Sequence, residues 1–554
     1  MTDRSVPGRS GQEQMNAAIG GGLTVTGAES VPGAAEAIAQ ALADDVPARL
    51  VAKDPTLWGP EAEAEARIRL GWVDLPYTSR ELLGRLDALR AELVAEGLDH
   101  VVLSGMGGSS LAPEVIARTL GVELVVLDTT DPHQVRRAIA NRLDRTVVVV
   151  SSKSGGTVET DSHRRAYHQA FLDAGLSPEE AGRRFVVVTD PGSPLEATAA
   201  EVGARAVFLA DPNVGGRYSA LTAFGLVPSA LAGVNIGELL DEATEVHQTL
   251  AGENPALALG AALGAAATGG RDKLVLAEDG SGIVGLGDWA EQLIAESTGK
   301  DGKGILPVVV ESPTASGTQG SDVLFATVGG AAREVPPPVA AKPDLTVNGP
   351  LGAHFLGWEY ATAIAGRILG INPFDQPNVA ESKENTARIL EGGLPETTPA
   401  FTDGAIEVYG DASLLGGAGD IADALTALLG SIDERGYLAV MAYLDRTGDS
   451  AAGELRPLLA ARTSRPVTFG WGPRFLHSTG QYHKGGPPVG SFLQITGAVV
   501  EDLPVPGKPY TFGTLEAAQA AGDLQALSGR GRPTLRLHLT DRAAGLAQLV
   551  AAFR

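Results

Sequence analysis

The sequence predicts an α/β protein with two doubly wound parallel-sheet domains, preceded by a helical part and followed by a C-terminal extension. Three observations predict this fold. Short apolar strands alternate with helical segments from residue 100 onward. Runs of β-branched residues such as 147–150 suit strands that are buried on both faces of a parallel sheet. Loops rich in glycine and serine follow two of these strands, where doubly wound sheets bind their ligands.

The N-terminal part is predicted to be a flexible tail over 1–22, followed by helices over 23–99. Ala- and Leu-rich stretches at 34–43 and 81–96 carry apolar residues at helical spacing. The first α/β domain is predicted over 100–235, with strands at 101–103, 124–127, 146–150, 185–188 and 206–209.

The second α/β domain is predicted over 236–391, and the extension over 392–554 is predicted to contribute to it. Its strands form one series at 273–277, 305–310, 324–328, 438–443, 467–471, 492–495 and 535–539. Helices are predicted at 289–295, 354–369, 379–390, 454–461 and 542–553. The stretch 391–403 is rich in Gly, Pro and Thr, which indicates a boundary.

The composition is that of a globular protein with an acidic surface. The 554 residues are 44% hydrophobic and 20% charged, enough for a large core. A net charge of −24 disfavours nucleic acid and membranes as partners, so an anionic small molecule would need a locally positive pocket. The absence of cysteine excludes disulfides and thiol catalysis and fits a cytoplasmic protein. No uncharged apolar run reaches the ~18 residues that indicate a spanning helix.

Two loops of the first domain suit a phosphate group. Residues 105–110 (GMGGSS) and 151–157 (SSKSGGT) each follow a strand and precede a helix. Glycine lets the backbone approach a ligand, and a helix N-terminus attracts anions. A tight strand–helix turn explains the first loop equally well. The second loop offers four hydroxyls and Lys153, more than a helix cap requires, so it favours a ligand.

Several further candidates are polar side chains in glycine-rich or irregular segments. Arg217 lies in Gly-Gly-Arg-Tyr-Ser and would add forked donors. Glu296 ends a predicted helix, and Gln376 and Lys383 lie seven residues apart. Taken singly, each of these residue types is more often a solvated surface residue.

The glycine-rich segment 472–486 contains two histidines, His477 and His483. Their spacing, with no carboxylate nearby in the sequence, is poor for a metal site. Acid–base work by one of them is therefore favoured.

Taken together, these segments resemble phosphoglucose isomerase (glucose-6-phosphate isomerase), a family of the sugar-isomerase (SIS) fold. The resemblance covers residues 100–390 and rests on five motifs in the same order, which is far more specific than any one of them. They are the glycine-serine loop 105–113, the phosphate loop 151–160 ending in Glu-Thr, Gly-Gly-Arg-Tyr-Ser at 215–219, Glu-Ser-x-Gly-Lys at 296–300, and Phe-Asp-Gln with its later lysine at 374–383.

The resemblance implies roles for individual residues in the interconversion of glucose 6-phosphate and fructose 6-phosphate. Glu296 would move the proton between C1 and C2, and Arg217 would stabilise the enediolate. Lys383 would help open the sugar ring, and Gln376 would contact the phosphate or the chain. The phosphate would be held by Ser109, Ser152, Lys153, Ser154 and Thr157, while Gly108 and Gly216 would let the backbone approach the sugar. No metal or cofactor is implied.

One feature departs from the family. The ring-opening histidine of the family follows soon after the catalytic glutamate, and residues 297–350 here contain no histidine. The C-terminal part resembles the isomerase half of fused transaldolase–isomerase proteins. We therefore expect His483, or else His477, to replace the missing histidine. The family usually lends this histidine from a dimer partner, so both a monomer and a homodimer are open.

Two alternative functions are left open. An isomerase that also accepts mannose 6-phosphate depends on the pocket shape at C2. A non-catalytic sugar-phosphate-binding SIS protein would need no base, and the presence of Glu296 argues against it. Transaldolase activity is disfavoured because the resemblance covers only the isomerase half.

Overall fold

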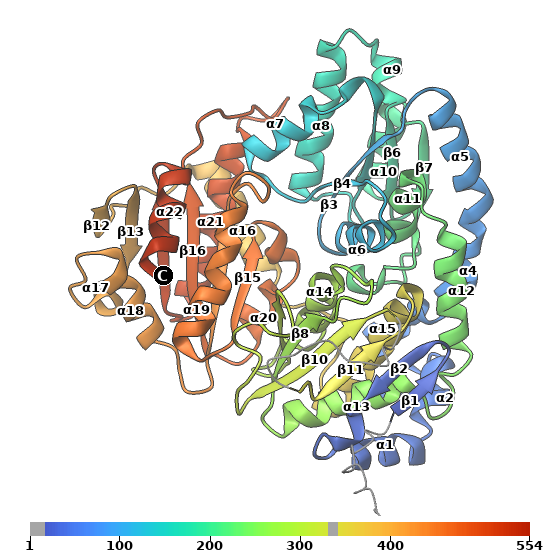
Figure 1. Ribbon diagram of the computed structural model, residues 1–554. Helices are drawn as coiled ribbons and strands as arrows, with labels where there is room; N and C mark the ends of the chain where they lie inside the picture. The colour runs from blue at the N-terminus through green and yellow to red at the C-terminus, as the bar shows by residue number, and fades with distance from the viewer. Residues whose placement is uncertain (1–16, 331–341, 554) are drawn as a thin grey trace, which may run out of the picture.

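The computed structural model describes residues 17–330 and 342–553, which form three sheets with helices packed around them (Figure 1). The strands at the centre of each sheet run parallel, which confirms the predicted α/β class with doubly wound parallel sheets. Each sheet marks one domain, and the three domains meet in the middle of the molecule.

The first domain has a five-stranded parallel sheet with strand order β4-β3-β5-β6-β7. Its strands are β3 (His100–Gly105), β4 (Val125–Leu127), β5 (Thr146–Ser151), β6 (Phe185–Thr189) and β7 (Ala206–Leu209). Its main helices are α6 (Leu111–Leu120), α7 (Pro132–Ala140), α8 (Val158–Asp173), α10 (Pro194–Glu201) and α11 (Ala223–Ala232).

The β-branched run of β5 is buried on both faces, as the sequence predicts. Val147 and Val149 share a core with α6 and α11, whereas Val148 and Val150 share a core with α8 and α10. Successive side chains of a strand point to opposite faces, so only a strand covered by helices on both sides uses four valines in a row.

The second domain has a six-stranded sheet with strand order β1-β2-β11-β10-β8-β9. Its parallel strands are β8 (Lys273–Glu278), β9 (Leu306–Val310), β10 (Val323–Gly329) and β11 (Leu345–Asn348). Its helices are α12 (Ile236–His247), α13 (Pro255–Thr268), α14 (Leu286–Thr298) and α15 (Leu351–Leu369). The α14 helix connects β8 to β9 and carries Glu296 in its last turn.

The N-terminal prediction requires a correction. Part of the expected tail and the start of the expected helical part form a hairpin of β1 (Ala17–Gly20) and β2 (Leu23–Thr26), which adds antiparallel strands to the second sheet through β11. Leu23 and Val25 are fully buried, so the hairpin is held by core packing. Residues 1–16 of the expected tail lie outside the described residues.

The rest of the N-terminal part is helical, as expected. Its longest helices are α1 (Ala34–Ala43) and α5 (Leu83–Ala95). The α1 helix packs against α13 of the second domain, and α5 packs against α11 of the first. This part therefore joins the first two domains along one side.

The C-terminal extension also requires a correction, because its strands build a third sheet instead of extending the second. The strand order is β12-β13-β17-β16-β14-β15. The strands are β12 (Phe401–Asp403), β13 (Ile406–Gly410), β14 (Tyr437–Tyr443), β15 (Val467–Trp471), β16 (Gly490–Gly497) and β17 (Thr534–Leu539). The helices are α16 (Ala380–Gly392), α18 (Ile421–Gly430), α19 (Leu455–Thr463), α20 (Gly480–Gly485), α21 (Phe512–Ser528) and α22 (Arg542–Phe553).

The third domain has a core of its own and a second core that it shares. Leu438 and Val440 of β14 pack into a cluster made entirely of third-domain residues. Ala439 and Met441 of the same strand pack instead into a cluster with Val275 of β8 and other residues of the second sheet. The third domain is thus a separate body that is docked on the second through apolar side chains.

In the part of the chain that the structure describes, no helix is both long and apolar enough to cross a bilayer.

We expect the shared core to be sensitive to truncation. Phe325 of β10 is 2% exposed and lies in the cluster between the second and third domains. Phe325→Ala should lower the free energy of unfolding by about 3–5 kcal/mol, because a buried phenyl ring leaves a cavity. Denaturant unfolding measures this, with Val500→Ala at an 86% exposed position as a control that changes it by less than about 0.5 kcal/mol. Equal stability of the two variants would contradict the shared core.

Candidate functional site

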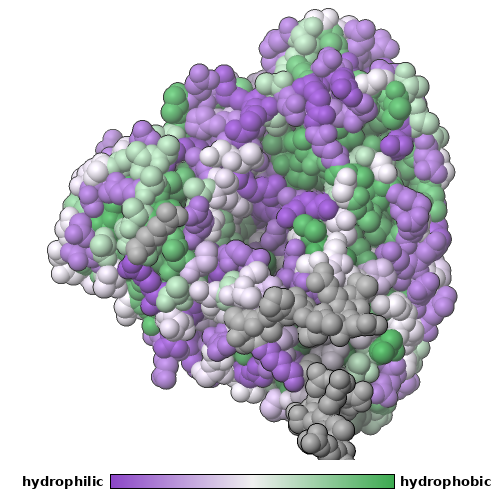
Figure 2. All heavy atoms as spheres, viewed as in Figure 1, coloured by the Kyte–Doolittle hydropathy of each residue, from purple (hydrophilic) through white to green (hydrophobic). Residues whose placement is uncertain are grey.

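A cavity of about 250 Å³ lies where the first domain, α16 and the third domain meet. The surface is hollowed between the first and third domains in Figure 2, and hydrophilic residues gather around the hollow. The cavity is lined by the loop before α8, by the outer face of α16 and by the segment that contains His477. Polar groups from sequence segments more than 300 residues apart therefore face one space.

The predicted phosphate loop forms one wall of this cavity. Ser154, Gly156 and Thr157 line it directly before the first turn of α8. Ser152 is buried behind them, and its Oγ lies 2.9 Å from the Oγ1 of Thr157. The side chain of Thr157 makes no capping hydrogen bond to α8, so the backbone N–H groups of the first turn are not occupied by it, and Thr157 and this turn line the cavity. The arrangement suits an anion.

Two lysines line the cavity, Lys383 from α16 and Lys484 from α20, and Lys153 is not among the lining residues. The Nζ of Lys484 is paired with the buried Asp523 at 2.8 Å. The Nζ of Lys153 lies 2.6 Å from the Oδ2 of Asp190, directly after the neighbouring strand β6. Its charge is already paired at the same sheet edge, and its predicted contact with phosphate stays a prediction. Lys383 lines the cavity from α16 and has no ion-pair or hydrogen-bond partner within residues 17–330 and 342–553.

His477 lies in the cavity and is paired with a buried carboxylate. Its Nε2 is 3.1 Å from the Oε1 of Glu159, in the first turn of α8. The same oxygen accepts a hydrogen bond of 2.7 Å from the Nε2 of Gln519 on α21. Burial would raise the pKa of Glu159, but the charge and hydrogen bond of His477 outweigh it and lower the pKa to about 2. Glu159 is thus an anion suited to stabilise a protonated imidazole.

His483, the other candidate, is a core residue. It is 3% exposed, and its ring lies among the rings of Tyr437, Phe475 and Phe492. Neither ring nitrogen has a hydrogen-bond partner among the described residues. Burial lowers the pKa of His483 to about 3, so the ring is neutral. Its prediction as an acid–base group is wrong because α20 directs it into the apolar interior.

Glu296 is a buried carboxylate next to a buried arginine. It is 8% exposed, and its Oε2 lies 3.5 Å from the Nη1 of Arg217 and 3.4 Å from the Nε2 of Gln292. Burial raises the pKa of Glu296, while the charges of Arg217, His477 and Lys383 oppose that rise. Glu296 does not itself line the cavity, but the cavity's histidine and lysine are within electrostatic range of it.

Arg217 is fixed by a ring of acceptors. It lies in the short helix η7 (Gly216–Tyr218), and its Nε donates to the Oγ of Ser297 at 2.9 Å. Its Nη2 donates to the carbonyls of Pro373 and Asp375 at 2.8 Å each. Its Nη1 donates to the side-chain oxygen of Gln376. Gln376 therefore orients the arginine, and its predicted contact with the substrate is not seen in this arrangement.

Lys300, the last residue of the Glu-Ser-x-Gly-Lys motif, binds the loop that contains Asn372 and Asp375. Its Nζ donates to the carbonyls of Asn372 and Asp375 at 2.8 and 2.6 Å and pairs with the Asp375 carboxylate at 2.6 Å. Burial lowers the pKa of Lys300 to about 8, opposed by Asp375. The motif thus supplies the carboxylate, a hydroxyl for Arg217 and a lysine that holds the loop around Arg217.

The glycines at 108 and 216 allow two loops to touch each other. A Cβ on Gly108 would lie 1.8 Å from the carbonyl oxygen of Gly216. The Oγ of Ser219 donates to both carbonyls. This close contact joins η5 (Gly107–Ser109) to η7 and so positions Arg217, whereas the approach of these glycines to the sugar stays a prediction. Ser109 is buried within η5 and does not line the cavity, which removes the support for its predicted phosphate contact.

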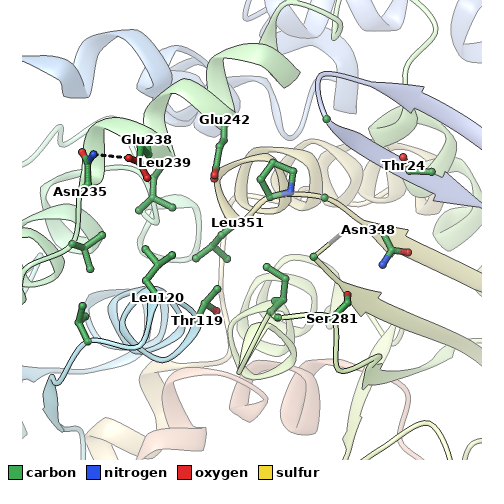
Figure 3. A pocket seen from close by; sticks show the side chains of 18 of the residues that line it. Thr24, Thr119, Leu120, Asn235, Glu238, Leu239, Glu242, Ser281, Asn348 and Leu351 are labelled. Atoms are coloured by element: carbon green, nitrogen blue, oxygen red, sulfur yellow. Dashed lines mark hydrogen bonds between the residues drawn. The ribbon is translucent and has the colours of Figure 1, made fainter. Parts of the chain in front are cut away.

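A second, larger cavity of about 700 Å³ lies at the carboxyl edge of the second sheet (Figure 3). Its described lining contains no lysine, arginine or histidine. Glu242 points into it and accepts a hydrogen bond of 2.8 Å from the backbone N–H of Gly352. Glu238 accepts a hydrogen bond from the side-chain amide of Asn235. Burial raises the pKa of Glu242. This cavity is acidic and does not suit a phosphate, so its size does not make it the candidate site.

The chain is similar to phosphoglucose isomerases in sequence and shares its fold with a solved one. Residues 91–302 match the family model of phosphoglucose isomerase. The chain is 29% identical to a glucose-6-phosphate isomerase of Clostridium perfringens over 395 residues, which are 58% of this chain and 86% of that protein. It is 37% identical to the glucose-6-phosphate isomerase of Acaryochloris marina over 216 residues, 36% of this chain and 40% of that protein.

Solved structures share the fold. A hypothetical protein from Thermus thermophilus is 26% identical, with a TM-score of 0.54, and the match covers 68% of this chain and 100% of that one. A glucose-6-phosphate isomerase from Chlamydia trachomatis is 21% identical, with a TM-score of 0.50, and the match covers 68% of this chain and 90% of that one.

The buried, neutral state of His483 makes a prediction about pH. Its folded pKa of about 3 lies below the ordinary 6.5, so the unfolded chain binds a proton that the folded chain does not. The stability that His483 contributes is present above pH 6.5 and is lost as the pH falls toward 3. His483→Leu should therefore lose about 2 kcal/mol less stability than the wild type between pH 7.5 and 5.0. Denaturant unfolding at both pH values measures it, and parallel losses would show that His483 is not buried neutral.

Proposed function

We propose that this protein is a glucose-6-phosphate isomerase, which interconverts glucose 6-phosphate and fructose 6-phosphate through a cis-enediol. The observation that carries the proposal is that the Glu296–Arg217 pair lies within electrostatic range of His477 and Lys383, which line a cavity beside a phosphate-suited loop. The relatives from Clostridium perfringens and Acaryochloris marina are named glucose-6-phosphate isomerases, and their similarity to this chain supports the same activity here.

The phosphate of the substrate binds at the loop before α8. Ser154, Thr157 and the first turn of the helix provide donors, and Lys383 provides charge. This remote contact fixes the sugar relative to the catalytic groups. The unphosphorylated sugars should therefore be much poorer substrates, because their binding energy is not available to orient the chain.

Ring opening falls to His477. It transfers a proton between the O1 hydroxyl and the ring oxygen O5, which breaks the C1–O5 bond and leaves the aldehyde. The Glu159 carboxylate, 3.1 Å from its Nε2, stabilises the imidazolium that forms in the transfer. Lys383 adds positive charge at the same cavity, which favours a developing oxyanion.

Isomerisation falls to Glu296. The carboxylate removes the C2 proton of the open-chain aldose, and the electron pair moves to form the enediolate. Arg217 stabilises the oxyanion, held in place by its four acceptors. Glu296 then returns the proton to C1, while a second proton moves from the O2 hydroxyl to O1, which gives the ketose. The step is redox-neutral and balances with one proton moved from C2 to C1 and one from O2 to O1.

Each chain supplies all of these groups itself. His477 comes from the same chain as Glu159 and Glu296, so the proposed site needs no partner subunit. We propose that the monomer is competent, whether or not it forms a homodimer. The cytoplasmic location and the likeness of the C-terminal part to the isomerase half of fused transaldolase–isomerase proteins stay predictions from the sequence.

Replacement of the base tests the reaction. Glu296→Gln should lower turnover of glucose 6-phosphate by about 10²–10⁴-fold and abolish deuterium exchange at C2, because the amide cannot accept the proton. A coupled assay and NMR exchange in D₂O measure the two effects. Glu359→Gln is the matched control, since Glu359 is a fully buried carboxyl whose pKa is raised well above 4.5 by burial and which lies outside the cavity.

The pH profile gives a second reading of the same residue. Only the carboxylate accepts the proton, and burial raises the pKa of Glu296 above 4.5. Turnover should therefore fall as the pH is lowered through that raised value, and the fall should begin above the pH at which an ordinary glutamate titrates.

Phosphosugars that bind without any turnover would favour the sensor alternative, and turnover of mannose 6-phosphate would favour the broader isomerase.

Variants of His477 and His483 should differ in their effect on ring opening. His477→Gln should lower conversion of cyclic glucose 6-phosphate by about 10²–10⁴-fold, because ring opening loses its acid–base group. His483→Leu should retain conversion, because the residue packs in the core. Stopped-flow assays with freshly dissolved single anomers measure both variants. Normal rates in His477→Gln would sink the assignment.

A further inference from the structure

The turn that carries His477 is held from two sides by residues outside its own domain. It is the short helix η9 (Arg474–His477), which follows β15 in the third domain. On one side, the Nη1 of Arg474 lies 2.5 Å from the Oε2 of Glu114 and 2.9 Å from the Oδ2 of Asp128. Glu114 is on α6 and Asp128 directly follows β4, so both carboxylates belong to the first domain.

The other side of the turn contacts α14. The Oγ of Ser478 donates to the Oε1 of Glu291 at 3.1 Å, five residues before the base Glu296 on the same helix. Gly107 of the first domain also lies against the turn, since a Cβ there would be 3.0 Å from the carbonyl of His477. The turn is therefore tied to the first domain and to the helix of the base.

Arg474 cannot touch a substrate in the cavity. Leu476 and His477 line the substrate cavity, whereas Arg474, Phe475 and Ser478 line a different cavity of about 340 Å³ on the opposite side of the turn. The turn is thus the wall between two spaces. Arg474 can therefore act on the reaction through the position of His477, to which it is joined in the turn, and its other contact near the site is a longer one, 3.7 Å from its Nη2 to the Oδ2 of Asp288 on α14.

The ion pairs of Arg474 are buried. The side chain of Arg474 is 10% exposed and that of Asp128 only 3%. Burial would raise the pKa of Glu114, but the charges of Arg474 and Arg446 outweigh it and lower the pKa to about 2. A guanidinium with two carboxylates holds a fixed direction, because its donors are planar and directional.

We propose that Arg474 is a positioning residue for ring opening: by binding Glu114 and Asp128 across the domain interface, it holds the Nε2 of His477 against Glu159. This inference rests on the proposed isomerase function. It makes the ring-opening step depend on the docking of the third domain onto the first. The proton transfer by Glu296 depends on it less, because Arg217 and its acceptors contain no residue of the turn. The contact of Arg474 with the helix of Glu296 is also longer, 3.7 Å to Asp288, whose side chain is 44% exposed.

The test separates ring opening from isomerisation. Exchange between the α and β anomers of glucose 6-phosphate requires ring opening alone, and NMR exchange spectroscopy measures its rate in the presence of enzyme. Arg474→Met should lower this rate by up to about 10²-fold, as expected for a catalytic group misplaced by about 1 Å. The rate of C2 deuterium exchange, measured per molecule of open-chain aldose, should change much less. Arg474→Lys keeps the charge and should recover part of the anomer exchange.

Arg456→Met is the matched control. Arg456 is also a buried arginine of the third domain, and its salt bridge to Glu311 also crosses to another domain. It lies outside both cavities. This variant should keep the wild-type anomer exchange while losing a comparable amount of thermal stability.

If Arg474→Met does not fold, the variant with Glu114→Gln and Asp128→Asn added removes the uncompensated charges and takes its place. Wild-type anomer exchange in the folded variant would overturn the positioning role and leave the isomerase function intact. A wild-type protein that neither isomerises nor exchanges anomers would overturn the proposed function itself.

Discussion

Both carboxylates of this site are buried, and a buried charge is stable only beside a partner of opposite sign. Glu296 faces Arg217, and Glu159 faces His477. Removing one member of such a pair costs about 3–5 kcal/mol, because the other is left uncompensated in a low dielectric. The partners come from different segments and, for His477 and Glu159, from different domains. The arrangement of the three sheets is therefore constrained by the need to bring these pairs together.

Much of the fold could be predicted because strand burial has a local signature. The valine run of β5 predicted a strand covered on both faces, and its side chains divide between two cores. The third domain could not be predicted in the same way. Its strands have the same apolar pattern as those of the second domain, and the pattern does not state which sheet a strand joins. The β1–β2 hairpin was missed because each strand is only four residues long.

The motifs indicated which segments would lie near the site, and they did not determine which side chains of those segments line the cavity. Glu296, Arg217 and Thr157 lie where their motifs indicate. Two lysines and two histidines were each chemically suitable, and the sequence could not tell which of them would face the cavity. Asp190 neutralises Lys153, and the aromatic rings around His483 bury it.

Glu159 and Gln519 were not predicted to have roles. Glu159 stood at the end of the phosphate loop, but its partner His477 lies 318 residues away. Gln519 lies in an Ala-rich helix without any motif. Only the tertiary structure brings these side chains together, because each makes its essential contact with a residue from another domain.

The walls of the substrate cavity belong to separate bodies, since the loop before α8 is in the first domain and the His477 turn is in the third. A wall made of two bodies depends on how they are docked, so the cavity and the His477–Glu159 pair have the same requirement. A change that weakens the contact between the first and third domains would therefore alter the shape of the cavity and the imidazole–carboxylate distance together.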